Sequence, residues 1–307
     1  MTAAPILLRR GPLTVGIAPH AGGSLSKFEF VRGNRRFDIL RPAVDRPVRV
    51  IEALNMSSFI TVPYAGRLRE GRFEFEGRMI EYPLNGLPER HSSHGDGFMR
   101  PWQVKRLETD QAELETLPLA AAPIQYRCTQ FFHLTETSLA IRVRAHNLEQ
   151  RRIPFEIGFH PYFASRTLAR IRAHLPLQWH WDRELMPTMR CHNLLQPDFA
   201  QGLEAKRLPM AAEYDGWDGQ AHIDWPDRGI GVTVSTQPAL RHVVTWAPAG
   251  EDFFCFEPLS HATDSFNRAG RETAIDPVRT LDPGAFLEQT CIFRVSDTDS
   301  RRENPGP

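Results

Sequence analysis

The feature that most constrains the fold of this chain is an alternation of apolar and polar residues with a period of two. Ile141, Val143 and Ala145 would lie on one face of an extended segment, and Arg142 and Arg144 on the other. The same alternation recurs in residues 73–76, 232–235, 242–246 and 291–295. Because successive side chains of a β-strand point to opposite faces, the pattern predicts half-buried strands along most of the chain.

Turn residues separate these segments. Residues 28–31 and 37–40 flank Arg32-Gly33-Asn34-Arg35, which predicts a strand, a turn and a second strand. The 25 prolines and 21 glycines leave little room for long helices. Residues 111–117 have a helix-friendly composition, but their place between two strand-like segments favours one arm of a hairpin. Many short strands joined by turns predict an all-β sandwich or barrel.

The composition is that of a globular protein. Of the 307 residues 41% are hydrophobic and 24% charged, and 37 Lys and Arg balance 37 Asp and Glu. A net charge of zero argues against nucleic-acid binding, which needs a basic surface. No composition break marks a second domain, so we expect one catalytic domain over residues 1–296 and a disordered C-terminal tail over 297–307.

Nothing in the sequence predicts a membrane segment or a secretory signal. No apolar run approaches the roughly 18–20 residues that a membrane span needs, and residues 1–12 carry only a short apolar stretch followed by two arginines. The four cysteines are widely spaced without a Cys-x-x-Cys pair, which favours free thiols in a reducing cytoplasm over a zinc site.

Three segments could carry chemistry, and each has a simpler alternative. His94 lies in a glycine-rich loop, where it could bind a ligand or be a solvated surface histidine. His160 lies among bulky apolar residues at a strand end, which suits a general acid but also a core histidine bonded to a carbonyl. Glu257 follows a run of aromatic residues, where burial would raise its pKa toward that of a general base, or where it could pair with an arginine.

Two further segments give weaker signals. Asp218 follows Trp217 in a glycine-flanked turn, a combination that suits a sugar but also occurs in ordinary turns. Arg67 could bind hydroxyl groups or be a surface cation. His94, His160 and Glu257 show no metal-binding spacing, so we expect no metal. The phosphate-binding loops and the Gly-x-Ser-x-Gly serine motif are absent.

Taken together and in this order, the motifs resemble the aldose 1-epimerase (galactose mutarotase) family over residues 12–296. The matching motifs are Gly66-Arg67-Leu68 with Gly71-Arg72-Phe73, His94-Gly95 with Arg100-Pro101-Trp102-Gln103-Val104, Gly158-Phe159-His160-Pro161-Tyr162-Phe163, Gly216-Trp217-Asp218-Gly219, Phe256-Glu257-Pro258 with Asp264-Ser265-Phe266-Asn267, and Leu281-Asp282-Pro283-Gly284. The sequence departs from the family pattern at Gly66, Gly219 and Ala285.

The resemblance implies one large antiparallel β-sandwich, the galactose-mutarotase-like supersandwich. It also implies interconversion of the α and β anomers of a free aldose, a small sugar, without a cofactor. By the same resemblance Glu257 is the expected general base and His160 the general acid, held on opposite sides of the hemiacetal. His94 and Arg67 are then expected to position the substrate, and Asp218 to bind a hydroxyl group.

Two other functions fit the same sequence. A hexose-6-phosphate mutarotase would use cations such as Arg67, Arg69 and Arg72 around the phosphate. A non-catalytic sugar-binding protein would keep the cleft without the reaction. The sequence leaves open the preferred sugar, the oligomeric state, the role of His91 and the choice between Arg67 and Arg69 as the substrate contact.

Overall fold

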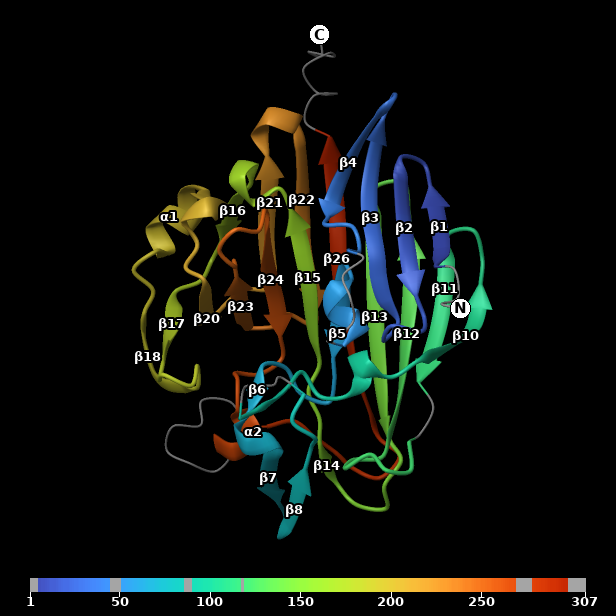
Figure 1. Ribbon diagram of the computed structural model, residues 1–307, viewed down its shortest axis with the longest axis vertical. Helices are drawn as coiled ribbons and strands as arrows, with labels where there is room; N and C mark the ends of the chain where they lie inside the picture. The colour runs from blue at the N-terminus through green and yellow to red at the C-terminus, as the bar shows by residue number, and fades with distance from the viewer. Residues whose placement is uncertain (1–4, 45–50, 86–89, 117–118, 269–277, 298–307) are drawn as a thin grey trace.

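Two large antiparallel sheets form the two layers of the molecule, seen in the computed structural model, which describes residues 5–44, 51–85, 90–116, 119–268 and 278–297 (Figure 1). The first sheet has 11 strands. In spatial order these are β1 (Ile6–Arg10), β2 (Leu13–Ala18), β3 (Ser24–Arg32), β4 (Arg35–Leu40), β15 (Gly158–Ala164), β24 (Phe253–Leu259), β23 (His242–Trp246), β20 (Ala211–Asp215), β17 (Leu177–Trp181) and β18 (Pro187–His192), with β5 (Ser58–Thr61) pairing with β15 and β3.

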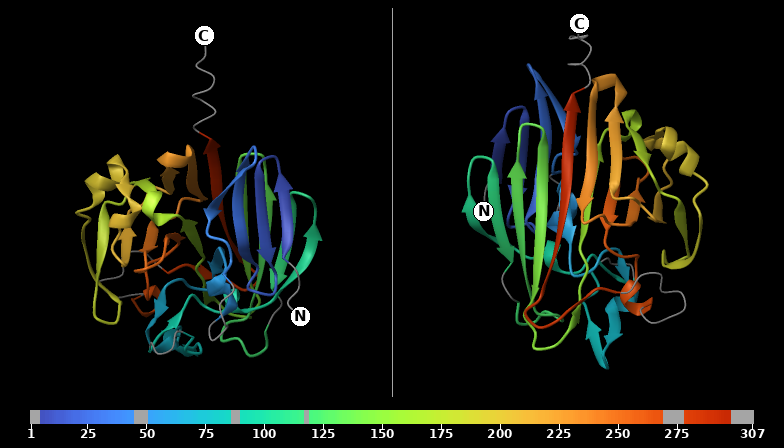
Figure 2. Two further views of the ribbon diagram at one scale, coloured as in Figure 1. Left: turned by 45° about the horizontal axis from the view of Figure 1, so that its top comes forward. Right: turned by 180° about the vertical axis from the view of Figure 1, so that it is seen from behind.

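The second sheet has nine strands and lies behind the first in Figure 1; Figure 2 shows it from the other side. Its strands are β10 (Trp102–Leu107), β11 (Gln111–Thr116), β12 (Tyr126–Leu134), β13 (Ser138–Asn147), β26 (Phe286–Asp297), β22 (Ile230–Gln237), β21 (Gln220–Trp225), β16 (Arg170–Ala173) and β19 (Leu203–Glu204). The described α-helices are short, α1 (Gln196–Gln201) and α2 (Ser265–Arg268). The predicted all-β sandwich is therefore confirmed.

Three short strand pairs complete the described strands. They are β6 (Arg67–Leu68) with β9 (Ser92–Ser93), β7 (Arg72–Phe75) with β8 (Arg78–Glu81), and β14 (Ile153–Pro154) with β25 (Thr280–Leu281). They lie at the lower end of the molecule in Figure 1.

The period-two pattern decides which side chains fill the core. Phe159 of β15 and Phe254 and Phe256 of β24 belong to the main apolar core. The alternate residues Tyr162 and Phe253 belong to a separate cluster that includes Phe59 and Phe98. Strands β15 and β24 are thus buried on both faces, and the face away from the main core carries His160 and Glu257 because these share the parity of Tyr162 and Phe253.

Most of the strand predictions agree with the structure, and one boundary is wrong. Residues 111–116 form a strand paired on both sides, by β10 and β12. The expected tail was to begin at Asp297, but this residue ends β26, where its carboxylate accepts a hydrogen bond from Arg32 Nε at 3.0 Å. Residues 298–307 lie outside the described part of the chain.

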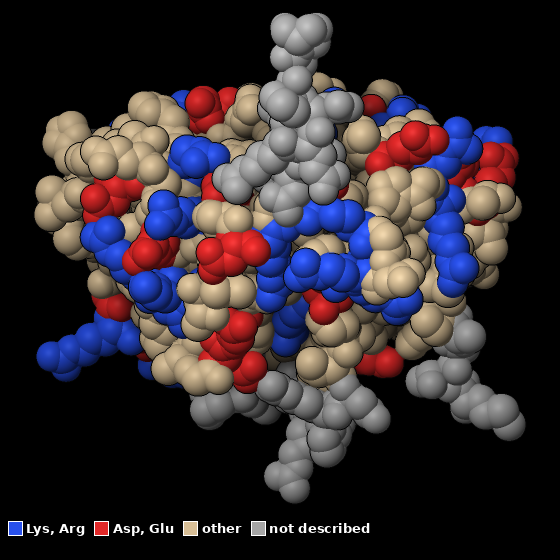
Figure 3. Space-filling model, turned by 90° about the horizontal axis from the view of Figure 1, so that it is seen from above, with Lys and Arg blue, Asp and Glu red and all other residues tan. Residues whose placement is uncertain are grey.

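The surface and the thiols agree with the composition. Acidic and basic side chains are interspersed on the face seen from above in Figure 3. All four cysteines are free, and Cys128, Cys255 and Cys291 are buried. No helix in the described residues is both long and apolar enough to cross a membrane.

The buried carboxyl group of Glu156 connects Arg279 by a hydrogen bond to the segment that leads into β15. The carboxyl of Glu156 accepts hydrogen bonds from Ser260 Oγ at 2.5 Å and from the backbone N–H of Arg279 at 3.0 Å. Burial raises the pKa of Glu156 to about 7, against the effect of these hydrogen bonds. The folded state therefore binds this proton more tightly than the unfolded state, and the group stabilises the fold less as the pH rises from about 4.5 to 7.

We predict that Glu156→Gln removes this pH dependence. The free energy of unfolding of the wild type minus that of the variant should fall by about 2–3 kcal/mol between pH 5 and pH 8, since one pKa unit is worth about 1.4 kcal/mol. Urea denaturation at the two pH values measures the difference. Glu74→Gln, at an exposed position, is the control. A free-energy difference for Glu156→Gln that changes with pH no more than that of the control would contradict the prediction.

Candidate functional site

The site is centred on one histidine and one carboxyl group on neighbouring strands. Gly158 and Tyr162 of β15 pair with Leu259 and Cys255 of β24, so His160 falls directly opposite Glu257. His160 Nε2 lies 3.3 Å from Glu257 Oε1, and both side chains are buried, with exposed fractions of 6% and 3%. The expectation that the two groups are held on opposite sides of the hemiacetal is wrong, because the strand register places them side by side.

Burial favours the uncharged forms of both groups. It raises the pKa of Glu257 well above its ordinary value; Arg67 opposes this shift and Glu213 adds to it. Burial is the main cause that lowers the pKa of His160 well below its ordinary value, and the nearby His94 and Arg41 lower it further. Both shifts favour a protonated carboxyl group at Glu257 and a neutral imidazole at His160.

Aromatic rings fix the orientation of His160. Its ring lies against those of Phe59 and Tyr162, at centroid distances of 4.4 and 4.8 Å. His94 meets it edge-on at 5.1 Å. A ring confined by three neighbouring rings loses little further freedom when a ligand binds, which favours a precise proton transfer.

His94 and Arg67 reach the pocket through one short strand pair. Arg67 of β6 lies opposite Ser93 of β9, which places the next residue, His94, beside the arginine. The backbone N–H of Gly66 donates to His94 Nδ1 at 3.3 Å, and the N–H of His94 donates to the carbonyl of Gly66 at 2.9 Å. Because Nδ1 accepts a hydrogen bond, the proton of the neutral ring lies on Nε2, which can donate to a ligand.

The loop after His94 is anchored by a buried polar network. Asp96 accepts a hydrogen bond from Tyr126 Oη at 2.6 Å and forms an ion pair with Arg100. The backbone N–H groups of Asp96 and Gly97 both donate to the carbonyl of Val62, at 3.1 Å. His94 itself has a left-handed φ of +62°, a conformation that costs a non-glycine residue energy and persists where surroundings impose it.

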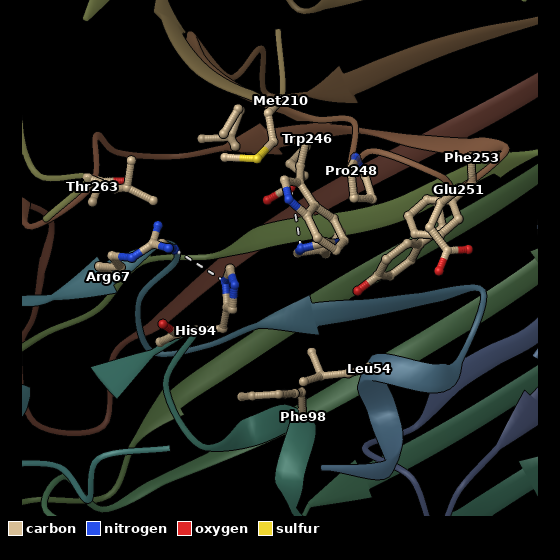
Figure 4. A pocket seen from close by; sticks show the side chains of 18 of the residues that line it. Leu54, Arg67, His94, Phe98, Met210, Trp246, Pro248, Glu251, Phe253 and Thr263 are labelled. Atoms are coloured by element: carbon tan, nitrogen blue, oxygen red, sulfur yellow. Dashed lines mark hydrogen bonds and ion pairs between the residues drawn. The ribbon is translucent and has the colours of Figure 1, made fainter. Parts of the chain in front are cut away.

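Arg67, His94, His160 and Glu257 all line one pocket, which has a volume of about 560 Å³ (Figure 4). Arg67, His94 and Thr263 lie at one end of the view, and Glu251 and Phe253 at the other. Other lining residues come from several parts of the chain. Arg41 follows β4, Leu54 and Asn55 lie in a short 3₁₀ helix before β5, and Asn85 follows β8. Trp181, Met210, Trp246 and Pro248 come from β17, β23 and the loops before β20 and after β23. Sequence reasoning therefore brought Arg67, His94, His160 and Glu257 to one place.

Sequence reasoning missed several residues at or beside the pocket. Glu213 of β20 is buried next to it, and its carboxyl accepts hydrogen bonds from Trp181 Nε1 at 3.1 Å and from the N–H of Thr263 at 2.7 Å. Trp246 lines the pocket from β23. The signal for Glu213 was available: a carboxylate inside the alternating segment 211–215 must be buried and paired if that segment is a central strand.

The structure does not bring Asp218 to the pocket. Asp218 is exposed in the turn between β20 and β21, where one of its carboxylate oxygens accepts the backbone N–H of Gln220 at 3.2 Å. Trp217 packs against Phe256, and Asp215 is buried and paired with Arg190 and Arg241. The turn that resembled a sugar-binding motif is a structural one, and Asp218 is corrected from a hydroxyl-binding group to a turn residue.

Arg69 and His91 also serve the structure. Arg69 pairs with Glu184 at 3.3 Å and with Asp182 and Asp264 at 3.7 Å. His91 is buried, and its Nδ1 accepts the N–H of Glu70 at 3.1 Å. Neither lines the pocket, so Arg67 is the arginine of this pair that a ligand would meet.

One group of possible metal ligands occurs among the described residues. Ligand atoms of His160, Cys255 and Glu257 lie within 4.8 Å of one another. This set has Cys255 in place of the His94 considered from the sequence. Burial raises the pKa of Cys255 well above its ordinary value, which disfavours the thiolate that a metal requires, and the absence of a metal stays a prediction.

Comparison with known proteins identifies the family. The family model described as aldose 1-epimerase matches residues 7–294. The chain belongs to the aldose 1-epimerase family. The expected family and its sandwich fold are confirmed.

Several relatives share the sequence and the fold of this aldose 1-epimerase family member. The uncharacterized protein YphB of Escherichia coli K12 is 32% identical over 265 residues, covering 84% of this chain and 88% of YphB. A crystal structure of an E. coli K12 protein described as a candidate aldose 1-epimerase has a TM-score of 0.83 and 28% identity, over 95% of this chain and 99% of that one. A galactose mutarotase-like protein from Clostridium acetobutylicum, 17% identical with a TM-score of 0.82 over 95% of each chain, shares the fold.

We predict that the position of His94 depends on Gly95. Gly95 has a φ of +69°, and a Cβ atom there would lie 2.0 Å from the carbonyl oxygen of Val62. Gly95→Ala should lower the free energy of unfolding by at least about 2 kcal/mol more than Gly77→Ala, because overpacking adds to the conformational cost. Gly77 has a φ of +75° with nothing within 4 Å of its Cβ, so it isolates the conformational cost. Equal losses in denaturation measurements would contradict this account of the loop.

Proposed function

We propose that this protein interconverts the α and β anomers of a free aldose by opening and reclosing the sugar ring. Glu257 acts as the general base and His160 as the general acid. The observation that carries the proposal is the buried contact of 3.3 Å between these two groups on the wall of a pocket that can hold a sugar.

The side-by-side arrangement suits this reaction. Ring opening removes a proton from the hydroxyl group on C1 and delivers one to the ring oxygen, and both oxygens are bonded to C1. Two adjacent groups can therefore serve both oxygens at once. The bond between C1 and the ring oxygen breaks, the aldehyde turns about the C1–C2 bond, and the ring closes on its other face while Glu257 and His160 exchange roles. General acid–base catalysis of this kind contributes about 10²–10⁴-fold.

The pair must rearrange its proton before it reacts in these roles. Burial favours the proton on Glu257, whereas a base at Glu257 and an acid at His160 require the proton on His160. The two forms contain the same number of protons and differ only by a transfer along the contact of 3.3 Å. The positive charge of Arg67 favours ionised Glu257 and thus the reactive form.

The other pocket residues would hold the sugar. His94 donates a hydrogen bond from Nε2, and Arg67 contacts hydroxyl groups, as polar groups that converge in a largely preformed pocket commonly do. Burial lowers the pKa of His94 to about 3, so the ring stays neutral at ordinary pH. Holding the sugar against the pair supplies the orientation on which the proton transfers depend.

The phosphorylated substrate is the weaker alternative. Of the three arginines that suggested it, Arg67 lines the pocket, whereas Arg69 pairs with Asp182, Glu184 and Asp264, and Arg72 pairs with Glu70. Competition of glucose 6-phosphate against glucose in the mutarotation assay separates the two. Stronger inhibition by the phosphate ester than by a neutral sugar would favour the alternative.

The third function, sugar binding without catalysis, predicts a different result. If neither the wild type nor Glu257→Gln accelerates mutarotation and both bind sugar equally, the protein is a binding protein. Polarimetry of freshly dissolved α-D-glucose and α-D-galactose, with and without protein, gives the first answer.

We predict that Glu257→Gln and His160→Asn each lower kcat by at least roughly 10²-fold, because each removes one of the two proton-transfer groups. Circular dichroism and thermal unfolding verify that the variants fold. Glu74→Gln, on an exposed strand position, should keep the wild-type rate. A rate near that of the wild type in either pair variant refutes the role of that residue.

We also predict that kcat/KM shows no acid limb at pH 6.5. The pair gains a second proton well below that value, because the pKa of His160 is lowered, and it loses its only proton well above pH 4.5, because the pKa of Glu257 is raised. Activity should therefore fall on the acid side only below pH 6.5. Polarimetric rates between about pH 5 and 9, corrected for the buffer reaction, measure the profile. An acid limb centred on the ordinary pKa of histidine contradicts the assignment.

A further inference from the structure

Asp264 begins a motif to which the proposed function assigns no role, residues 264–267. Its side chain is buried, with an exposed fraction of 6%, and it is not among the residues that line the pocket. It directly follows Thr263, which lies at the same end of the pocket as Arg67 (Figure 4). A buried carboxyl group needs hydrogen-bond partners, and those of Asp264 include the backbone around Arg67.

Hydrogen bonds hold β6 on both of its sides. On one side the strand pairs with β9, where Arg67 lies opposite Ser93. On the other side the backbone N–H of Asp264 donates to the carbonyl oxygen of Arg67 at 3.1 Å. Oδ1 of Asp264 accepts the backbone N–H of Arg69 at 2.9 Å. Asp264 therefore fixes the two peptide groups that follow Arg67 in the chain.

These two hydrogen bonds imitate those of a neighbouring parallel strand. In a parallel pair a residue donates its N–H to the carbonyl of residue i of the other strand and accepts the N–H of residue i+2 through its own carbonyl. In Asp264 the side chain takes the place of that carbonyl, which instead accepts the N–H of Asn267 at 3.1 Å as the chain turns into α2. Asp264 has a left-handed φ of +59°, which Asp adopts more readily than most residues.

The position of the Arg67 side chain matters twice in the proposed function. Its guanidinium contacts hydroxyl groups of the sugar, and its positive charge lowers the pKa of Glu257 against the larger, opposite effect of burial. The energy of both interactions depends on distance and orientation. Freedom of the backbone at Arg67 would therefore weaken the hold on the sugar and the preference for ionised Glu257 together.

We propose that Asp264 is a positioning residue, which holds the backbone of Arg67 so that the guanidinium meets both the sugar and Glu257. This inference rests on the proposed function and adds a residue to it. The effect comes from the hydrogen bond to the N–H of Arg69 and not from charge. The ion pair between Asp264 and Arg69 Nε is 3.7 Å long and joins a side chain that is 43% exposed, and such pairs contribute little.

The test compares a variant that removes the acceptor with one that keeps it. Asp264→Gly removes the carboxyl group and tolerates the left-handed backbone, and for mutarotation of glucose it should lower kcat and raise KM by at least about threefold each. Asp264→Asn keeps an oxygen that can accept the N–H of Arg69, so both constants should stay within about twofold of the wild type. Asp218→Gly removes a carboxylate that accepts a backbone N–H in an exposed turn, and this matched control should leave both constants unchanged.

A double-mutant cycle separates positioning from a merely structural role. In an Arg67→Met background, Asp264→Gly should lower kcat/KM by less than about twofold, because the group that it positions is gone. The loss of stability caused by Asp264→Gly, measured by urea denaturation, should be the same in both backgrounds. An equal fall in kcat/KM in both backgrounds, or an Asp264→Asn variant as slow as Asp264→Gly, would overturn the proposal.

A spectroscopic readout does not depend on catalysis. In protein labelled with ¹⁵N-arginine, the Nε–H signal of Arg67 is identified by its loss in Arg67→Met. Its heteronuclear NOE, which reports the order of the side chain, should fall in Asp264→Gly and stay at the wild-type value in Asp264→Asn. If glucose is mutarotated while neither this signal nor the kinetics respond to Asp264→Gly, the positioning role is refuted and the proposed function stands. If no sugar is mutarotated but the order of Arg67 still depends on Asp264, the proposed function fails and the positioning of Arg67 stands.

Discussion

The contact between His160 and Glu257 is the interaction on which the rest of this account depends. It exists because β15 and β24 pair in one register, with Gly158 opposite Leu259 and Tyr162 opposite Cys255. A shift of that register by one residue would turn one partner toward the main core and separate the pair. The aromatic residues of alternate parity, Phe254 and Phe256, are buried in that core and hold the register.

Burial gives this contact its chemical character. In water an imidazole and a carboxylate would each keep their ordinary pKa, and at neutral pH the proton would be lost to solvent. In the pocket burial shifts the two pKa values in opposite directions, which favours a protonated carboxyl group beside a neutral imidazole. The same strands carry the aromatic residues that exclude water, and the fold thus supplies both the geometry and the low-dielectric environment that proton transfer requires.

The sequence predicted which side chains share a face of a strand better than it predicted which residues from different strands lie close together. Period-two alternation predicted the sandwich, and the resemblance named Arg67, His94, His160 and Glu257, all of which line the pocket. The side-by-side position of His160 and Glu257 depends on pairing between strands about one hundred residues apart, which no local pattern encodes. Asp218 was misassigned because the sequence of the turn is the same whether Trp217 stacks on a sugar or packs edge-on against Phe256.

The central claim is that His160 and Glu257 act as one proton-sharing unit. A double-mutant cycle tests this claim most directly. Mutarotation rates of the wild type, Glu257→Gln, His160→Asn and the double variant are measured by polarimetry on one sugar. Because removing either partner already disables the unit, we expect the double variant to be about as slow as the slower single variant. A double variant whose loss equals the product of the two single losses would show that the two residues act independently and would contradict the account.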